Sequence, residues 1–225
     1  MTSKLAIQEA KNALDKQDTS SNANFTDWDF EDAFNKGLDD WIRKQINGMN
    51  AKQEQEEESE MKVDDLQVLL VERKLSVTSG DVYADTTRIP ENYRYFNKLT
   101  PIVTHSTCTK KTEIKSFFVE NANVDDYLQD WTFSPSFDFE QTFHVMLSNK
   151  FRIFHAGDFE VKEVKLSYYR SPQKISTLRA HYDRPWEWKD DVARIIIDEA
   201  VKLLAGNIES SNAFQLAKQR VDETT

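Results

Sequence analysis

The histidines are the side chains best suited to metal binding or acid–base catalysis in this sequence, which has four of them. His144 and His155 could face each other across a predicted turn, and Asp158 could complete a two-histidine site. Neither these residues nor His105 and His181 form an H-E-x-x-H or H-x-H pattern, which would place two ligands on one face. We therefore favour the alternative, in which the histidines pack on strands or lie at the surface.

Cys108 and the adjacent aspartate pairs are weaker candidates for chemistry. Lys110 lies near Cys108 and could lower the pKa of a thiol, but no base follows at a suggestive spacing, so we expect a small buried strand residue. Neighbouring carboxylates on a helix point about 100° apart and cannot act as a facing pair. For the pairs at 125–126 and 190–191 helix capping is the better interpretation, and the pair at 39–40 has no facing partner either.

Motifs for cofactors and nucleophiles are missing from the sequence. It contains no G-x-G-x-x-G, no Walker motif and no G-x-S-x-G. Its five glycines are too few for a phosphate-binding loop in addition to ordinary turns. We therefore expect no enzymatic activity, no cofactor and no bound metal.

An aromatic segment, DWTFSPSFDFEQTF, occupies residues 130–143. One interpretation is a stacking platform for sugars or bases. The others are packing onto a sheet, which we favour, and contact with a neighbouring subunit. Pro135 between two serines predicts an extended loop. The candidate subunit-contact residues, from this segment and the C-terminal tail, are Trp131, Phe133, Phe137, Phe139, Phe214 and Leu216.

Helices are predicted near both ends of the chain. Apolar residues recur at three- and four-residue steps over 3–17, 27–49 and 190–209, which is typical of amphipathic helices. The stripe at 3–17 is narrow, so this helix needs a partner surface. Pro90 suits a first helical position, and Tyr93, Phe96 and Leu99 follow it at helical spacing. Trp186 and Trp188 precede the last helix, where a hydrophobic staple is expected.

The middle of the chain is rich in β-branched and aromatic residues. We expect an antiparallel meander over about 101–178, with a helical turn at 123–130 and a hairpin of strands 151–155 and 159–170. Broken alternation predicts a bulge near Lys162–Glu163. The fold class is thus α+β, with the terminal helices packed with the sheet. The predicted regions are 1–100, 101–178 and 179–225, forming one compact domain with arms.

Charge and length exclude several classes of protein. The 225 residues carry a net charge of −10, unlike a nucleic-acid binder that acts through basic surface. A single cysteine excludes a disulfide scaffold and a cysteine-based zinc site. No apolar run approaches the roughly 20 residues of a membrane span, and no secretory signal is expected at the start. An acidic loop at 50–62 holds five glutamates, Glu54, Glu56, Glu57, Glu58 and Glu60.

Several segments in this order resemble those of a known protein family. They are WIRKQINGMN (41–50), the acidic loop, VDDLQVLL (63–70), IPENYRYF (89–96), WTFSPSFDFEQTF (131–143), NKFRIFHAGDF (149–159), LSYYRSP (166–172) and DDVARIIIDEAVKLLAGNIES (190–210). The series resembles the head-to-tail ring, or adaptor, proteins of crAss-like short-tailed bacteriophages. Residues before 27 and after 210 carry none of the resemblance.

The resemblance implies a structural part of a virion, assembled in the host cytoplasm. Such a protein forms a ring, commonly twelve-fold, and contacts the portal protein and neighbouring ring or tail proteins. Genomic DNA would pass through its lumen without specific binding, and the acidic loop is our candidate for a lumen-facing segment. The family has no catalytic residues. The alternative from the aromatic segment is a carbohydrate- or receptor-binding module of a phage tail.

Overall fold

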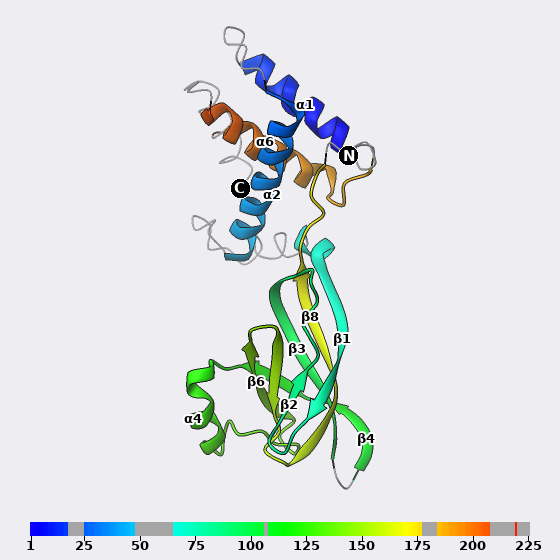
Figure 1. Ribbon diagram of the computed structural model, residues 1–225, viewed down its shortest axis with the longest axis vertical. Helices are drawn as coiled ribbons and strands as arrows, with labels where there is room; N and C mark the ends of the chain where they lie inside the picture. Colours follow the sequence, from blue (N-terminus) through cyan, green and yellow to red (C-terminus); the bar gives the residue numbers. More distant parts are fainter. Residues whose placement is uncertain (18–24, 48–64, 106–107, 177–183, 208–218, 220–225) are drawn as a thin grey trace. The chain divides into compact units, whose positions relative to one another are not determined.

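The computed structural model describes residues 1–17, 25–47, 65–105, 108–176, 184–207 and 219 (Figure 1). The chain divides into a helical unit, Met1–Val68 with Pro172–Thr225, and a sheet unit, Leu69–Ser171. The helical unit contains the long helices and the sheet unit contains eight strands. The α+β class predicted from the sequence is therefore confirmed.

Among the described residues, the helical unit contains the long helices α1 (Ser3–Gln17), α2 (Asp27–Asn47) and α6 (Asp190–Asn207), which lie close to their predicted ranges. Helix α2 packs along α6, and its buried face contains Phe34, Leu38 and Trp41. The two helices approach closely at Gly37, where an added Cβ would lie 3.3 Å from the backbone nitrogen of Ala200. Glycine at this position lets the two backbones come together.

Helix α1 finds the partner surface that its narrow apolar stripe requires within its own unit. It contacts both α2 and α6 and buries Ala6, Ile7, Ala10 and Leu14, whereas Leu5 is exposed. The backbone next to α1 is also held, because the Met1 carbonyl accepts a hydrogen bond of 2.7 Å from the amide of Trp186.

The two tryptophans before α6 pack on α2. The ring of Trp186 meets Phe34 edge-on at 6.1 Å between centroids, and Trp188 meets Trp41 at 5.1 Å. A hydrophobic staple would place such residues against the first turns of their own helix. Here they join the 184–189 segment to α2, and edge-to-face aromatic pairs of this kind stabilise a core beyond their buried area.

The sheet unit contains a mixed sheet in the order β4-β3-β8-β1-β2-β7-β6-β5. The strands are β1 (Leu70–Ser79), β2 (Tyr83–Thr86), β3 (Tyr93–His105), β4 (Cys108–Glu113), β5 (Lys115–Phe118), β6 (Gln141–Leu147), β7 (Lys150–Phe154) and β8 (Phe159–Arg170). Sequence neighbours are often apart in this order, β5 runs parallel to β6, and β1 and β2 begin before residue 101. The predicted antiparallel meander over 101–178 is therefore not the observed topology.

The sheet nearly closes into a barrel at Ile114. Strands β4 and β5 lie at opposite ends of the strand order, yet only Ile114 separates them in the chain. The amide of Ile114 donates a hydrogen bond to the carbonyl of Pro101 on β3. The next amide, that of Lys115, donates to the carbonyl of Glu140, which lies just before β6. One extended segment thus pairs first with β3 and then with β6. The parallel pairing with β6 requires the long connection Val119–Glu140, which we call the crossover.

Residues 93–99 form part of β3, and the helix predicted there is wrong. Register shifts leave one extra β3 residue between Tyr93 and Tyr95 and another between Phe96 and Lys98, opposite β8. Each extra residue turns the following side chain to the other face, so inward residues recur every third position. Tyr93, Phe96 and Leu99 therefore share a core at a spacing that imitates a helix.

The predicted hairpin of 151–155 and 159–170 is also not formed as a pair. Strand β7 pairs with β2 and β6, whereas β8 pairs with β1 and β3. The amides of His155 and Ala156 in the connecting turn bond the carbonyl of Val82 instead. The bulge predicted near Lys162–Glu163 is confirmed, because Ile102 and Val103 of β3 pair with Glu163 and Val161, which leaves Lys162 extra.

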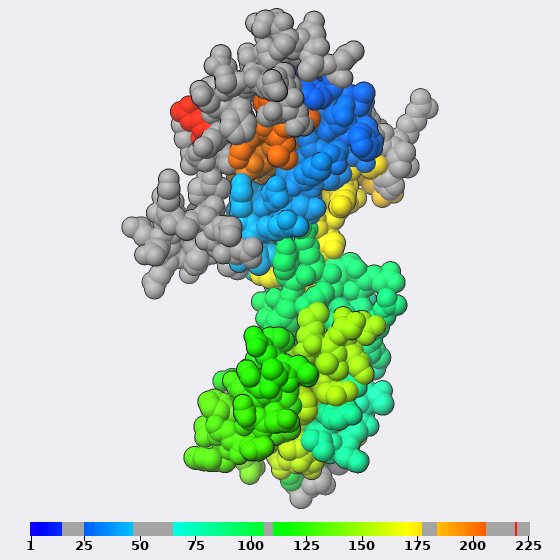
Figure 2. All heavy atoms as spheres, turned by 60° about the vertical axis from the view of Figure 1, so that its left-hand side comes forward, coloured from blue at the N-terminus to red at the C-terminus, as the bar shows by residue number. Residues whose placement is uncertain are grey.

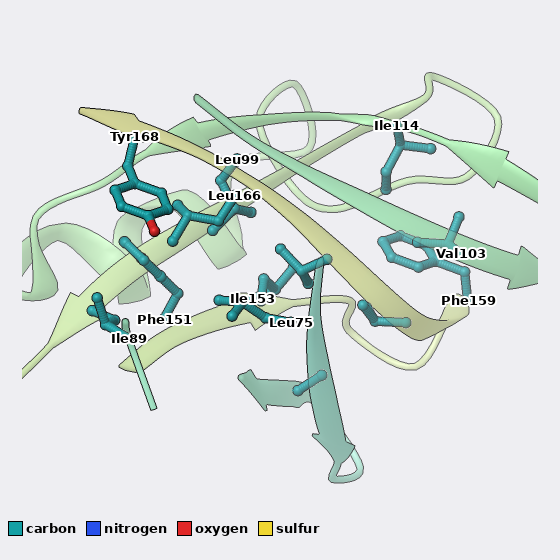
Figure 3. Close-up of a cluster of buried hydrophobic side chains, with 13 residues drawn as sticks. Leu75, Ile89, Leu99, Val103, Ile114, Phe151, Ile153, Phe159, Leu166 and Tyr168 are labelled. Atoms are coloured by element: carbon teal, nitrogen blue, oxygen red, sulfur yellow. The ribbon is translucent and has the colours of Figure 1, made fainter. Parts of the chain in front are cut away.

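One hydrophobic core fills the space between the curved strands (Figure 3). Leu75, Ile153 and Leu166 project into it from β1, β7 and β8, and Ile114 enters it at the closing segment. A second cluster includes Val119, Val124, Phe143, Val145 and Phe154 and lies under the crossover. The crossover is therefore packed onto the sheet and holds a defined position on this unit.

Candidate interaction surface

The crossover between β5 and β6 contains the helix α4 (Val124–Gln129) and an aromatic loop, residues 130–140. The helical turn predicted at 123–130 is thus confirmed. In the aromatic loop, the amides and carbonyls of Ser136 and Gln141 exchange hydrogen bonds of 3.0 and 3.1 Å. They close a tight turn in which Glu140 adopts a positive φ of 51°. The loop therefore has an internal backbone structure.

Side chains also hold the aromatic loop in place. The side-chain amide of Gln141 donates a hydrogen bond of 2.6 Å to the backbone carbonyl of Thr132. The carboxylate of Asp130 accepts a hydrogen bond of 2.8 Å from the backbone amide of Thr132. The carboxylate of Asp158, in the turn before β8, accepts the amide of Phe137 at 2.7 Å. These bonds orient the aromatic side chains of the loop.

Three of the four predicted contact residues in this loop are exposed to solvent. Trp131 is 80%, Phe139 68% and Phe133 47% exposed, although Phe133 also packs edge-on against Phe117. Phe137 is half-buried and packs against the ring of His105, with 4.9 Å between the ring centroids, so it is chiefly an anchor of the loop. The packing interpretation therefore applies to Phe137, and contact with a neighbouring subunit stays a prediction for the exposed rings.

Phe118 is a further exposed aromatic residue that sequence reasoning missed. It ends β5, is 55% exposed and meets the ring of His144 edge-on. Successive strand residues point to opposite faces, so Phe117 and Phe118 cannot both enter the same core. From the sequence, the adjacent pair indicated only that the two rings lie on opposite faces of the strand.

The crossover is acidic as well as aromatic. Residues 119–140 hold six acidic residues and no lysine or arginine. All six are exposed, namely Glu120, Asp125, Asp126, Asp130, Asp138 and Glu140. Asp125 and Asp126 lie in the first turn of α4, where the helix dipole stabilises their negative charges. They do not cap the helix as predicted, because the N-cap residue is Asn123. The exposed apolar rings are therefore surrounded by negative charge.

Three of the histidines, His105, His144 and His155, and Asp158 are engaged in structural contacts. His144 is fully buried, and its Nδ1 lies 2.7 Å from the hydroxyl of Ser116 on β5. The ring of Phe96 packs on it, and burial lowers the pKa of His144 to about 4. His155 accepts the amide of Gly157 at 3.2 Å.

No metal centre is found in the part of the chain that the structure describes. It holds no group of three or more His, Cys, Asp or Glu that could bind a metal ion. Two pockets measure about 180 and 200 Å³, one beside α2 and one beside Tyr93 and Met146. Pockets for drug-sized ligands measure roughly 300–1,000 Å³. Within the described helices, none has the length and apolar character to cross a membrane.

Several sequence candidates lie outside the described residues. These are Phe214 and Leu216 of the tail, the acidic-loop residues Glu54, Glu56, Glu57, Glu58 and Glu60, and His181. Cys108 begins β4, but its side chain is likewise outside the described part.

In comparisons with known proteins, no protein-family model and no curated protein matches this chain.

Proposed function

We propose that the chain is a structural ring subunit of a short-tailed bacteriophage virion, placed beneath the portal and forming part of the DNA channel. The aromatic loop is the observation that carries the proposal. Its backbone is fixed by hydrogen bonds, yet Trp131 and Phe139 bury little of their surface within the subunit. Large exposed apolar groups with a polar rim typically mark protein interaction sites.

The distribution of charge also supports a channel part. The helical unit holds 16 basic and 25 acidic residues, a net of −9, whereas the sheet unit holds 13 and 14, a net of −1. A lumen lined by acidic helices would repel phosphate and let DNA slide without being held. We place the helical unit and its acidic loop at the lumen, and the sheet unit at contacts between subunits or with the portal and tail proteins.

The histidine chemistry favours a structural over a catalytic role. The ring of His144 is enclosed by Phe96, Phe118 and Phe151 and bonded to a strand hydroxyl, and the carboxylate of Asp158 is used to hold a loop amide. An acid–base catalyst must reach a substrate proton within hydrogen-bond distance. The contacts of these two groups are those of packing and loop support.

Mass photometry and negative-stain microscopy of the purified chain, alone and mixed with portal protein, test the proposal. We expect closed rings, about twelve-fold, and loss of these rings when Trp131 and Phe139 are both changed to serine. Trp28→Ser is the matched control, because Trp28 is 68% exposed and lies outside the aromatic loop. A chain that stays monomeric at all concentrations and never binds virion parts would contradict the proposal.

The second candidate function is a carbohydrate- or receptor-binding module, which the exposure of Trp131 favours because sugars stack on exposed indole rings. A glycan array separates the two functions. Binding by the wild type that is lost in Trp131→Ala and Phe139→Ala, with no assembly phenotype, would support the module. Phe139 serves this test better than Phe137, since Phe137 packs on His105 and its loss would disturb the loop.

A further inference from the structure

We propose that the crossover of one copy docks on the lysine-bearing outer face of strands β1, β3 and β8 in a second copy of this chain. This inference rests on the proposed ring function and names the surface that receives the aromatic loop. The first half of the contact is the crossover. Its six exposed carboxylates and its exposed Trp131, Phe133 and Phe139 need a partner that is both basic and partly apolar.

The second half is a basic face on the same unit. Counted over both of their faces, strands β1, β3, β4 and β8 hold nine lysines and arginines and four glutamates, a net of +5. Lys74 on β1 pairs directly with Lys165 on β8, so both side chains point to the outer face, away from the buried Leu75 and Leu166. Like charges opposite each other on neighbouring strands are unfavourable unless a counter-charge is near.

Glutamates of this face offset only part of its positive charge. Lys165 bonds the carboxylate of Glu113 at 2.5 Å, and Lys165, Lys98 and Lys74 all lower the pKa of that carboxyl. Lys74 and Lys111 both approach Glu163, at 4.0 and 3.7 Å. Each glutamate is thus shared among several lysines, and these surface pairs are weak enough to be exchanged for carboxylates of another copy.

The two surfaces lie on opposite sides of the sheet unit. Figure 1 shows α4 on one side of the unit and β1 and β4 on the other. The crossover forms a continuous lobe of the surface (bright green in Figure 2). A contact between two different surfaces of identical copies is heterologous, and a fixed rotation between copies then closes a ring or builds a filament. A second copy therefore fits this arrangement better than an unrelated partner.

Charge reversal tests the contact without touching the aromatic loop anchors. The first variant carries Asp126→Lys and Asp138→Lys, which reverse two exposed carboxylates of the crossover. The second carries Lys74→Glu and Lys98→Glu on the outer face. Lys4→Glu with Lys36→Glu is the control for the second variant, since it lowers the net charge by the same amount on exposed residues of the helical unit. Circular dichroism establishes that each variant is folded.

We expect each variant alone to need at least tenfold more protein for half-maximal assembly in mass photometry, and the control to assemble as the wild type does. An equimolar mixture of the two variants should restore assembly, because each reversed surface then meets a reversed partner. The contact would be overturned by folded variants that assemble normally, or by a mixture in which assembly is not restored. In either case, rings formed by the wild type would still support the proposed function.

Zero-length carbodiimide cross-linking of mixed ¹⁴N- and ¹⁵N-labelled wild type gives a second, direct measurement. We expect isotope-mixed cross-links that join Asp126 or Asp138 of one copy to Lys74 or Lys98 of another. Rings whose cross-links map elsewhere refute this contact alone. Absence of both rings and mixed cross-links refutes the contact and the proposed function together.

Discussion

Acidification should destabilise the sheet unit through His144. The ring is fully buried on β6, its Nδ1 is bonded to Ser116, and its Nε2 is buried with no partner among the described residues. Protonation would place a positive charge against Phe96, Phe118 and Phe151, which cannot replace the water that the charge loses. Burial thus lowers the pKa of His144 from 6.5 to about 4.

The magnitude follows from the difference between the folded and unfolded pKa values. The folded pKa is the lower one, so the unfolded chain binds the proton more readily, and stability is present above pH 6.5 and lost as the pH falls. With 1.36 kcal/mol for each pKa unit, the full loss is about 3.4 kcal/mol, and about 2 kcal/mol is already lost between pH 7 and pH 5.

Comparison with His144→Asn isolates this contribution. Asparagine keeps a polar atom near the position of Nδ1 and cannot be protonated, so the variant is less stable at pH 7 because its smaller side chain leaves space. Carboxylates that titrate in both proteins cancel in the difference. Urea denaturation at pH 7, 6 and 5 should show the free energy of unfolding of wild type approaching that of the variant by about 2 kcal/mol. A constant gap, or an NMR titration of the His144 ring near pH 6.5, would refute the reasoning.

Three further predictions concern the contacts that hold each unit. The carboxylate of Asp85 accepts hydrogen bonds from Arg152 at 2.8 and 3.1 Å, and these bonds lower the pKa of Asp85. Asp85→Asn should therefore lower the free energy of unfolding at pH 7 by about 1–3 kcal/mol in urea denaturation. The cost should disappear as the pH falls through the lowered pKa, and Asp81→Asn should be neutral. Thr26 accepts the amide of Asp29 at the start of α2, so Thr26→Ala should lower stability by about 1 kcal/mol in thermal denaturation. Gly37→Val should cost about 1–3 kcal/mol by separating α2 from α6, unlike Lys36→Val on the exposed side; an unchanged melting temperature would contradict the close approach.

Local patterns in the sequence predicted the features that depend on neighbouring residues. The three long helices, the helical turn at 123–130 and the bulge near Lys162 all appear where the local sequence pattern places them. These features follow from side-chain spacing and backbone preference, which the sequence displays directly. The aromatic loop was recognisable for the same reason, as an irregular segment between strands.

Strand pairing could not be predicted in this way, because it depends on contacts between distant residues. The helical spacing of Tyr93, Phe96 and Leu99 has a different cause, two bulges that only the register with β8 reveals. The turn at 155–158 joins strands that are not partners, since β1 and β2 lie between them in the sheet.

The sequence by itself determined the α+β class, the long helices, the acidic character and the position of the aromatic segment. Tertiary structure alone decided which of its rings are exposed. Phe137 is held by His105 and Asp158, which come from other parts of the chain, whereas Trp131 and Phe139 find no such cover in their unit. Burial depends on contacts with residues that are distant in the sequence. Aromatic residues of one short loop can therefore serve as an anchor where such contacts exist and as an exposed surface where they do not.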